Sequence, residues 1–238
     1  MNDLEATKKP EFWINPNFTL NIYSSLELQE GMSVRLDDPA NNTQNIDGLL
    51  IFRIVVGENV TIKSNGVVIT SIQSVINAAY RRRVHVLFTS GGSYNFLDNF
   101  FAPRTRFYNG KIHSKRHNLT FGSFCRAGNN TNILDIQNST ITITGTFDFT
   151  STYFGGWTDA NNVYTWMGWR FLGNNPTLQT TGSHIIMQNG NYNHFYAMPA
   201  HQYGKISFMN ESVIHTALSC DTLISHFNLS TIQDIFPI

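Results

Sequence analysis

One short pattern occurs three times in the second half of this chain. Each copy has an apolar alternation, an asparagine, and a second alternation that starts three residues later. Alternation with period two predicts a strand on each side of the asparagine, and the two-residue spacer predicts a bend. Repeated strand–bend–strand units are typical of solenoids rather than sandwiches. The copies are Leu134-x-Ile136-x-Asn138-x-x-Ile141-x-Ile143, Ile185-x-Met187-x-Asn189-x-x-Tyr192-x-His194 and Ile206-x-Phe208-x-Asn210-x-x-Val213-x-His215.

The asparagines of this pattern give an expected count of coils. A partial fourth copy, Phe107-x-Asn109-x-x-Ile112, precedes the others, so the successive asparagines are 29, 51 and 21 residues apart. Coils of about 20–30 residues suit a solenoid with loops of unequal length. The gap of 51 residues is then interpreted as two coils, the hidden one near Trp169-x-Phe171-x-Gly173.

The composition is polar without being charged. Charged residues make up 13% of the chain, while Asn, Ser and Thr account for 68 of its 238 residues. The zero net charge hides a formal +4 over residues 1–126 and −4 over residues 127–238. With only eight charges in its second half, the chain lacks the basic footprint of a nucleic-acid-binding protein.

Several other features limit the classes of function that the sequence suggests. Cys125 and Cys220 are 95 residues apart, which fits neither a metal site nor a disulfide framework, and no cofactor motif is present. No apolar run is long enough for a membrane span. The opening residues lack the basic and apolar regions of a signal peptide, so we expect synthesis in a cytoplasm.

The first third of the chain divides into two expected parts. Residues 1–69 would form an arm and a small β region, either an attachment domain or the first irregular coils. Residues 70–83 carry apolar side chains at helical spacing, and Thr70 with Gln73 forms a capping box. This helix would cover the open end of a solenoid spanning residues 84–238.

The same region carries a resemblance. The block from Thr70 to Ala79, then Val84-His85-Val86-Leu87, then Gly91-Gly92-Ser93-Tyr94, resembles the entry to a pectate-lyase-type β-helix. Phage tailspikes and tail fibres use the same opening. The resemblance implies an all-β fold, a right-handed parallel β-helix with a short N-terminal capping helix. It also implies a virion location and a parallel homotrimer.

Catalysis of polysaccharide cleavage requires paired carboxylates or a carboxylate with a base. Asp148 and Glu211 are the weak candidates, since both are expected to point outward and would share a groove if their coils align. The favoured interpretation is that each is a lone surface carboxylate. We therefore lean towards a protein that is not an enzyme.

Two histidines occupy equivalent places in two copies of the pattern. Stacked coils would bring the imidazoles of His194 and His215 to about 5 Å from each other. A stacked polar ladder is favoured over a metal site, and no metal is predicted.

An aromatic segment is the candidate binding region. Aromatic rings stack on sugar rings, and the interspersed Asn and Thr suit the hydroxyls of a neutral glycan. A subunit interface and a buried core remain open as alternatives, because aromatic residues are enriched in both. The candidates for glycan or interface binding are Tyr153, Trp157, Tyr164, Trp166, Trp169, Tyr192 and Tyr196.

Together these observations predict a structural or receptor-binding virion protein, of the tail-fibre or tailspike kind. Its expected partners are copies of itself, other virion proteins through the N-terminal region, and a host surface polysaccharide. The alternatives are a small depolymerase on the same fold, and a capsid or head-decoration protein with a jelly roll.

Overall fold

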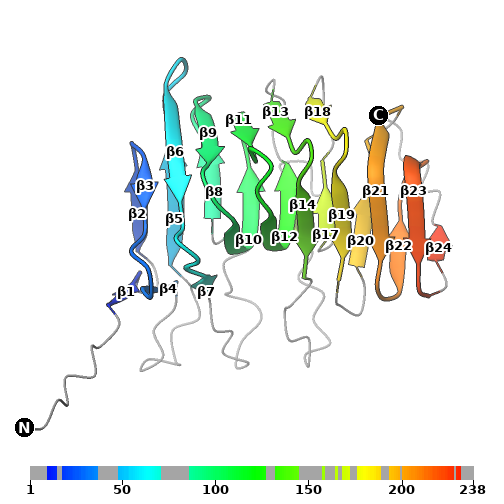
Figure 1. Cartoon of the computed structure of the whole chain (residues 1–238), viewed down its shortest axis with the longest axis horizontal. Helices are drawn as coiled ribbons and strands as arrows, with labels where there is room; N and C mark the ends of the chain where they lie inside the picture. Colours follow the sequence, from blue (N-terminus) through cyan, green and yellow to red (C-terminus); the bar gives the residue numbers. More distant parts are fainter. Residues whose placement is uncertain are drawn as a thin grey trace, which may run out of the picture.

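The chain is all-β in the parts that its computed structural model describes, and it contains no helix there. Figure 1 shows the strands standing side by side along the longest axis of the molecule, in chain order from blue to red. With one exception, all strand pairs are parallel. The described residues are 10–14, 18–36, 48–70, 86–126, 132–144, 157–158, 164–165, 168–171, 176–188, 193–198, 200–227 and 229–231.

The strands form three parallel ladders, each named here after one of its members. The β13 face is a six-stranded sheet with the order β18-β13-β11-β9-β6-β3. Its strands are β3 (Leu26–Glu27), β6 (Asn59–Lys63), β9 (Ser93–Phe96), β11 (Gly110–His113), β13 (Asn132–Asp135) and β18 (Thr177–Gln179).

The β14 face begins with a three-stranded sheet, which a parallel bridge between Val68 and Phe101 connects to β10. Its strands are β1 (Glu11–Trp13), β4 (Ser33–Arg35), β7 (Ile69–Thr70), the first halves of β10 (Phe100–Phe107) and β12 (Leu119–Arg126), then β14 (Thr140–Ile143), β19 (His184–Met187), β21 (Gln202–Phe208) and β23 (Ser219–Ser225).

The β17 face is the third ladder, and it includes the second halves of β10 and β12. Its other strands are β2 (Thr19–Ile22), β5 (Leu49–Arg53), β8 (Val86–Thr89), β17 (Gly168–Arg170), β20 (Asn193–Tyr196), β22 (Ser212–Ile214) and β24 (Leu229–Thr231). The antiparallel exception is a separate hairpin of β15 (Trp157–Thr158) and β16 (Tyr164–Thr165).

Two strands bend from one face to the next. In β12, Phe121 and Phe124 are both buried although their positions differ by three, so the inward parity changes between them. The register pairs Ala102 with Phe121 and resumes after Pro103 and Gly122. Proline has no N–H for a ladder and glycine has no Cβ, so both residue types suit a bend within a strand.

The chain visits the three faces in a fixed order. It passes from β13 to β14 to β17, and then from β18 to β19 to β20. Each strand pairs in parallel with the strand one circuit later: β13 with β18, β14 with β19, and β17 with β20. Side chains that point inward therefore stack on equivalent side chains of the neighbouring circuits.

Stacked aromatic rings fill much of the interior. Phe124, Trp169 and Phe195 share one register position on β12, β17 and β20, and each is at most 1% exposed. Their ring centroids are 5.3 and 6.3 Å apart with nearly parallel planes. A second stack joins Phe52 to Phe88 at 4.8 Å. Such offset stacks add to the burial energy of each ring.

Tight turns lead from the β13 face to the β14 face. At all of these turns except that between β9 and β10, one or two residues adopt the left-handed conformation, which Asn and Gly tolerate best. Asn138 was expected at a bend, and its φ of 54° confirms that position. The left-handed residues at these turns are Gly31, Asn65, Gly66, Lys115, Arg116, Asn138 and Gly182.

The coil count predicted from the asparagines is wrong. Asn138 lies between the β13 and β14 faces, whereas Asn210 follows β21 and leads to the β17 face. Because β14 pairs directly with β19, one circuit fills the gap that the sequence suggested was two. Trp169 belongs to β17 of that same circuit. The pattern marks any bend between two alternations, and a circuit over three faces has more than one such bend. Asn189 lies outside the described residues.

The N-terminal strands continue the same ladders. β2 and β5 precede β8 on the β17 face, and β3 and β6 precede β9 on the β13 face. The helix expected over residues 70–83 falls almost entirely outside the described residues, and Thr70 itself ends β7.

Candidate functional site

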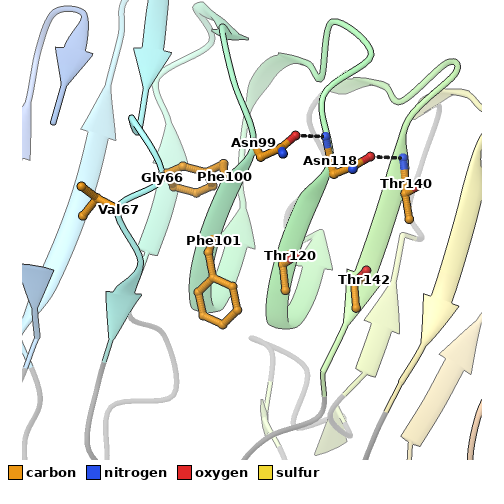
Figure 2. Close-up of a pocket in the computed structure, with 9 residues that line it drawn as sticks. All are labelled: Gly66, Val67, Asn99, Phe100, Phe101, Asn118, Thr120, Thr140 and Thr142. Atoms are coloured by element: carbon orange, nitrogen blue, oxygen red, sulfur yellow. Dashed lines mark hydrogen bonds between the residues drawn. The ribbon is translucent and has the colours of Figure 1, made fainter. Parts of the chain in front are cut away.

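A shallow groove of about 350 Å³ lies on the outer surface of the β14 face. Figure 2 shows its lining residues on β10, β12 and β14 and in the turns before β7, β10 and β12. The parallel register places equivalent residues of successive circuits side by side in it. The lining residues are Gly66, Val67, Asn99, Phe100, Phe101, Asn118, Thr120, Thr140 and Thr142.

An asparagine ladder borders one side of the groove. The backbone N–H of Asn118 donates to Asn99 Oδ1 at 2.8 Å, and the N–H of Thr140 donates to Asn118 Oδ1 at 3.2 Å (Figure 2). Each asparagine thus joins its own circuit to the next. These two bonds use the Oδ1 atoms and leave the Nδ2 donors of both exposed side chains unused by the ladder.

Hydroxyl groups and one aromatic ring form the outer column beside this ladder. Phe101 pairs in register with Thr120, and Thr120 pairs with Thr142. Neighbouring members of such a column are about 4.8 Å apart. The groove therefore offers a row of hydroxyls, a row of amides and an adjoining ring.

The groove is electrically neutral. None of its nine lining residues is charged. The column continues beyond it through Ile186 and Ser207, whose hydroxyl is hydrogen-bonded to His184 Nε2 at 2.8 Å. Burial lowers the pKa of His184, and the nearby Lys205 adds to that shift. The imidazole is therefore harder to protonate than that of an ordinary histidine.

The lining offers hydrogen-bonding groups and apolar contacts. Hydroxyls and amides both donate and accept hydrogen bonds, and a ring face offers an apolar contact. The lining contains no carboxylate and no histidine, so it supplies no side-chain general acid or base.

The predicted pairing of Asp148 with Glu211 stays a prediction, because only Glu211 lies within the described residues. Glu211 lies exposed in the turn between β21 and β22, as its position after Asn210 suggested, and Asp148 lies outside the described residues. Other carboxylates have structural roles. Asp98 accepts hydrogen bonds from the backbone N–H groups of Ser64 and Asn65 at 2.8 and 2.6 Å, and Asp135 pairs with His113 at 3.2 Å.

The aromatic candidates are placed differently from one another. Trp169 is a core residue. A buried core was one of the three roles left open for the aromatic candidates, beside glycan binding and a subunit interface. Tyr196 is half-buried on the β17 face and stacks on His215 with ring centroids 4.0 Å apart. Trp157 and Tyr164 lie on the β15–β16 hairpin, whose side chains are not described. Tyr153, Trp166 and Tyr192 lie outside the described residues.

The expected histidine stack is present. The rings of His194 and His215 are 4.7 Å apart, both side chains are buried, and Nδ1 of the first is hydrogen-bonded to Nε2 of the second. Burial, with a contribution from His215, lowers the pKa of His194 to about 4. Among the described residues, no group of three or more His, Cys, Asp or Glu is arranged to hold a metal ion.

The groove residues were not identified from the sequence. Their only signal was the run of polar residues at outward positions of strands, such as Thr120, Thr140 and Thr142, and such residues are expected on any exposed sheet face. Asn99 and Asn118 fall outside every copy of the repeat, so the repeat pattern gave them no weight.

Comparisons of the chain with protein-family models, curated proteins and solved structures found no match. Within the part of the chain that is described, no helix is long and apolar enough to cross a membrane.

Proposed function

We propose that this chain is a right-handed parallel β-helix that serves as a structural, receptor-binding protein and holds a neutral glycan in the groove of its β14 face. The observation that carries the proposal is the groove itself: nine uncharged lining residues with amides, hydroxyls and a ring side by side. The fixed order in which the chain visits three parallel ladders supports the β-helix.

The groove matches the chemistry of a neutral sugar chain. A saccharide presents hydroxyls that donate and accept, and C–H faces that pack on rings, so it is complementary to Thr120, Thr142 and Phe101. Charged side chains would cost desolvation without finding partners on such a ligand. The repeat of about 4.8 Å between strands places equivalent donors along the sugar chain.

The setting proposed for this activity is the surface of a virion. Support comes from the resemblance of the entry block to phage tailspikes and tail fibres, and from the elongated stack of parallel strands. Copies of the chain would associate as a trimer. The capsid alternative with a jelly roll is less well supported, because a jelly roll is built from antiparallel sheets.

A glycan array tests the proposal. Wild-type protein is applied to immobilised neutral polysaccharides, including mannan, galactan and dextran, together with two variants. Thr142→Arg places a bulky charge in the groove, and Thr177→Arg places the same charge at an exposed position of β18. We expect wild type and Thr177→Arg to bind the same neutral glycan and Thr142→Arg to lose it.

The competing depolymerase function is tested in the same samples. The proposal expects no new reducing ends or unsaturated products from the bound glycan. Cleavage that disappears in Glu211→Ala or Asp148→Ala would show that the protein is a depolymerase. Binding of the glycan by Thr142→Arg as strong as that of wild type would show that the groove is not the binding site.

A further inference from the structure

Within the described residues, the stack of parallel strands has an unpaired strand edge at each end. On the β14 face β23 pairs only with β21, and on the β17 face β24 pairs only with β22. At the opposite end, β1 pairs only with β4 and β2 only with β5. Figure 1 shows these strands at the two ends of the longest axis. The edge of a strand is a template on which another strand can pair.

One column of inward side chains runs the length of the β14 face and is exposed only at its two ends. It begins at Phe12 of β1 and ends at Ser225 of β23. Phe12 is 38% exposed and Ser225 is also exposed, whereas each member between them is at most 3% exposed. The members between them are Val34, Ile69, Ala102, Phe121, Ile143, Met187 and Phe208. Within the described structure, Phe12 and Ser225 therefore occupy core positions with a stacked neighbour on one side only.

A second inward column runs the length of the β17 face. Its first member is Leu20 of β2 and its last is Thr231 of β24, and between them it passes through the aromatic stack of β12, β17 and β20. In each column a bulky apolar residue holds the first position and a small hydroxyl residue holds the last. Stacking a first position on a last position would therefore fill space without overpacking, as in a protein interior.

The backbone at the first edge is oriented to continue the β14 ladder. Pro10 O accepts a hydrogen bond from Ser33 N–H at 2.9 Å, so the backbone of Pro10 faces β4. Successive residues of a strand turn their polar backbone groups to opposite sides, so those of Glu11 and Trp13 face the unpaired edge. The proline, which has no N–H, therefore leaves no gap on that edge.

The backbone at the last edge has the matching orientation. His226 N–H donates to Phe208 O at 3.2 Å, so the polar groups of the neighbouring Ser225 face the unpaired edge of β23. Placing Phe12 of a second copy over Ser225 brings the Trp13 N–H of that copy to Ser225 O. The side-chain column and the backbone hydrogen bonds thus require the same register.

We propose that the two ends form an interface between copies of this chain, in which β1 and β2 of one copy pair in parallel with β23 and β24 of the next. Phe12 then lies over Ser225, and Leu20 lies over Thr231. A second copy suits these edges better than an unrelated partner, because its first strands already lie in the register and direction that both columns need. The β13 face ends at β18 and takes no part, and the interface depends on neither the neutral groove nor the trimer.

The interface is small. β23 has seven residues and is about 23 Å long, and an inner layer is about 10 Å deep, so each end presents about 230 Å². Two such ends bury about 460 Å², well below the roughly 1,200 Å² of a stable complex. We therefore expect copies to join at high micromolar rather than at low micromolar concentration. Because the contact is head-to-tail, copies add in line without closing.

Sedimentation velocity of the whole chain, from low micromolar to near-millimolar concentration, tests the interface. We expect species of two and three times the mass of the particle seen at low concentration. This ratio is the same whether that particle is one chain or a trimer. Ser225→Arg places a bulky charge beneath the incoming ring, and Phe12→Ala removes that ring. Each should raise the dissociation constant for joining at least about tenfold.

Matched variants separate this interface from non-specific association. Thr222→Arg places the same charge on β23 at a position that pairs with the outward Lys205, and Tyr23→Ala removes an exposed ring that belongs to neither column. Both should change the dissociation constant less than about twofold. Far-ultraviolet circular dichroism and thermal melting establish that each variant is folded. The substitutions at positions 12 and 225 lie at opposite ends, so each tests the interface without the other.

A disulfide reports which ends meet. Phe12→Cys and Ser225→Cys are each made with both native cysteines, Cys125 and Cys220, replaced by serine. Partners in adjacent parallel strands are about 4.8 Å apart, which is within the Cα range of a disulfide. Oxidising a mixture of the two variants should give a covalent pair of the two different chains, and neither variant alone should give one.

Three results would overturn the interface. They are a wild-type mass that stays constant over the whole concentration range, equal weakening by Ser225→Arg and Thr222→Arg, and a covalent pair that forms as readily from one cysteine variant alone as from the mixture. The last result would mean that like ends meet instead of unlike ends.

Discussion

At the scale of single residues, what decides the role of a side chain is the direction in which its strand position points. Trp169 and Arg170 are neighbours in sequence, yet one is enclosed in the aromatic stack and the other reaches the surface of the β17 face. Trp169 is therefore a core residue, while Trp157 and Trp166 stay predictions for the binding region. The uncharged side chains at outward positions of β10, β12 and β14 form the candidate site.

Replacing Trp169 with alanine tests its core role. Truncating a fully buried aromatic side chain costs about 3–5 kcal/mol of unfolding free energy, whereas Trp169→Phe keeps the stack with Phe124 and should cost clearly less. Urea titration of the two variants measures both values. A loss below about 1 kcal/mol in Trp169→Ala would place this residue outside a packed core.

The buried histidine pair makes stability depend on pH. The pKa of His194 is about 4 in the folded chain, below the usual value of 6.5, so the unfolded chain binds more protons between these two values. Stability should be complete above pH 6.5 and fall by up to about 3 kcal/mol as the pH approaches 4. Urea unfolding at pH 7 and pH 4.5 measures the slope. His194→Asn, which does not titrate, should flatten it, and an unchanged slope in that variant would contradict the assignment.

At the scale of elements, the strands were easier to predict than their grouping. The alternations Leu134-x-Ile136 and Ile141-x-Ile143 are buried as expected, because period-two burial follows directly from the geometry of a strand. Which circuit a strand belongs to is set by pairing between distant segments, and no local pattern encodes that. The 51-residue gap was therefore miscounted, and the groove, made by four separate elements, was not foreseen.

Close packing between β17 and β20 gives a prediction about glycine. Gly168 has a φ of 134°, and a Cβ there would lie 2.1 Å from the backbone oxygen of His194. Gly57 also has a positive φ, yet a Cβ there would meet nothing within 4 Å. Gly168→Ala should therefore lose about 2 kcal/mol more stability than Gly57→Ala, because only the first adds overpacking to backbone strain. Equal losses in thermal melts of the two variants would mean that β17 and β20 are not in contact there.

At the scale of the whole molecule, three faces of one parallel stack carry three different chemistries. The β14 face is neutral in its groove, the β17 face carries arginine on tyrosine, and the β13 face carries the Lys63–Glu27 ion pair. A repetitive scaffold permits this division because outward side chains contribute little to its core. The outward chemistry of each face can therefore differ without altering the fold.

The proposed trimer follows from the resemblance to virion β-helices and is tested by native mass. One chain has a mass of 27.0 kDa, so light scattering at micromolar concentration should give three times that value. A mass of one chain across the accessible concentration range would contradict the trimer and leave the groove proposal untouched.

The location of the bound glycan tests the central claim most directly. Thr142→Cys places a thiol in the groove, Thr177→Cys places one on the β13 face, and the native Cys125 reports on the β17 face. Peptide-level mass spectrometry measures maleimide labelling of each thiol with and without the saturating neutral glycan. The account predicts that the glycan slows labelling at position 142 at least several-fold and leaves positions 177 and 125 unchanged. Protection at position 177 or 125 without protection at position 142 would contradict it.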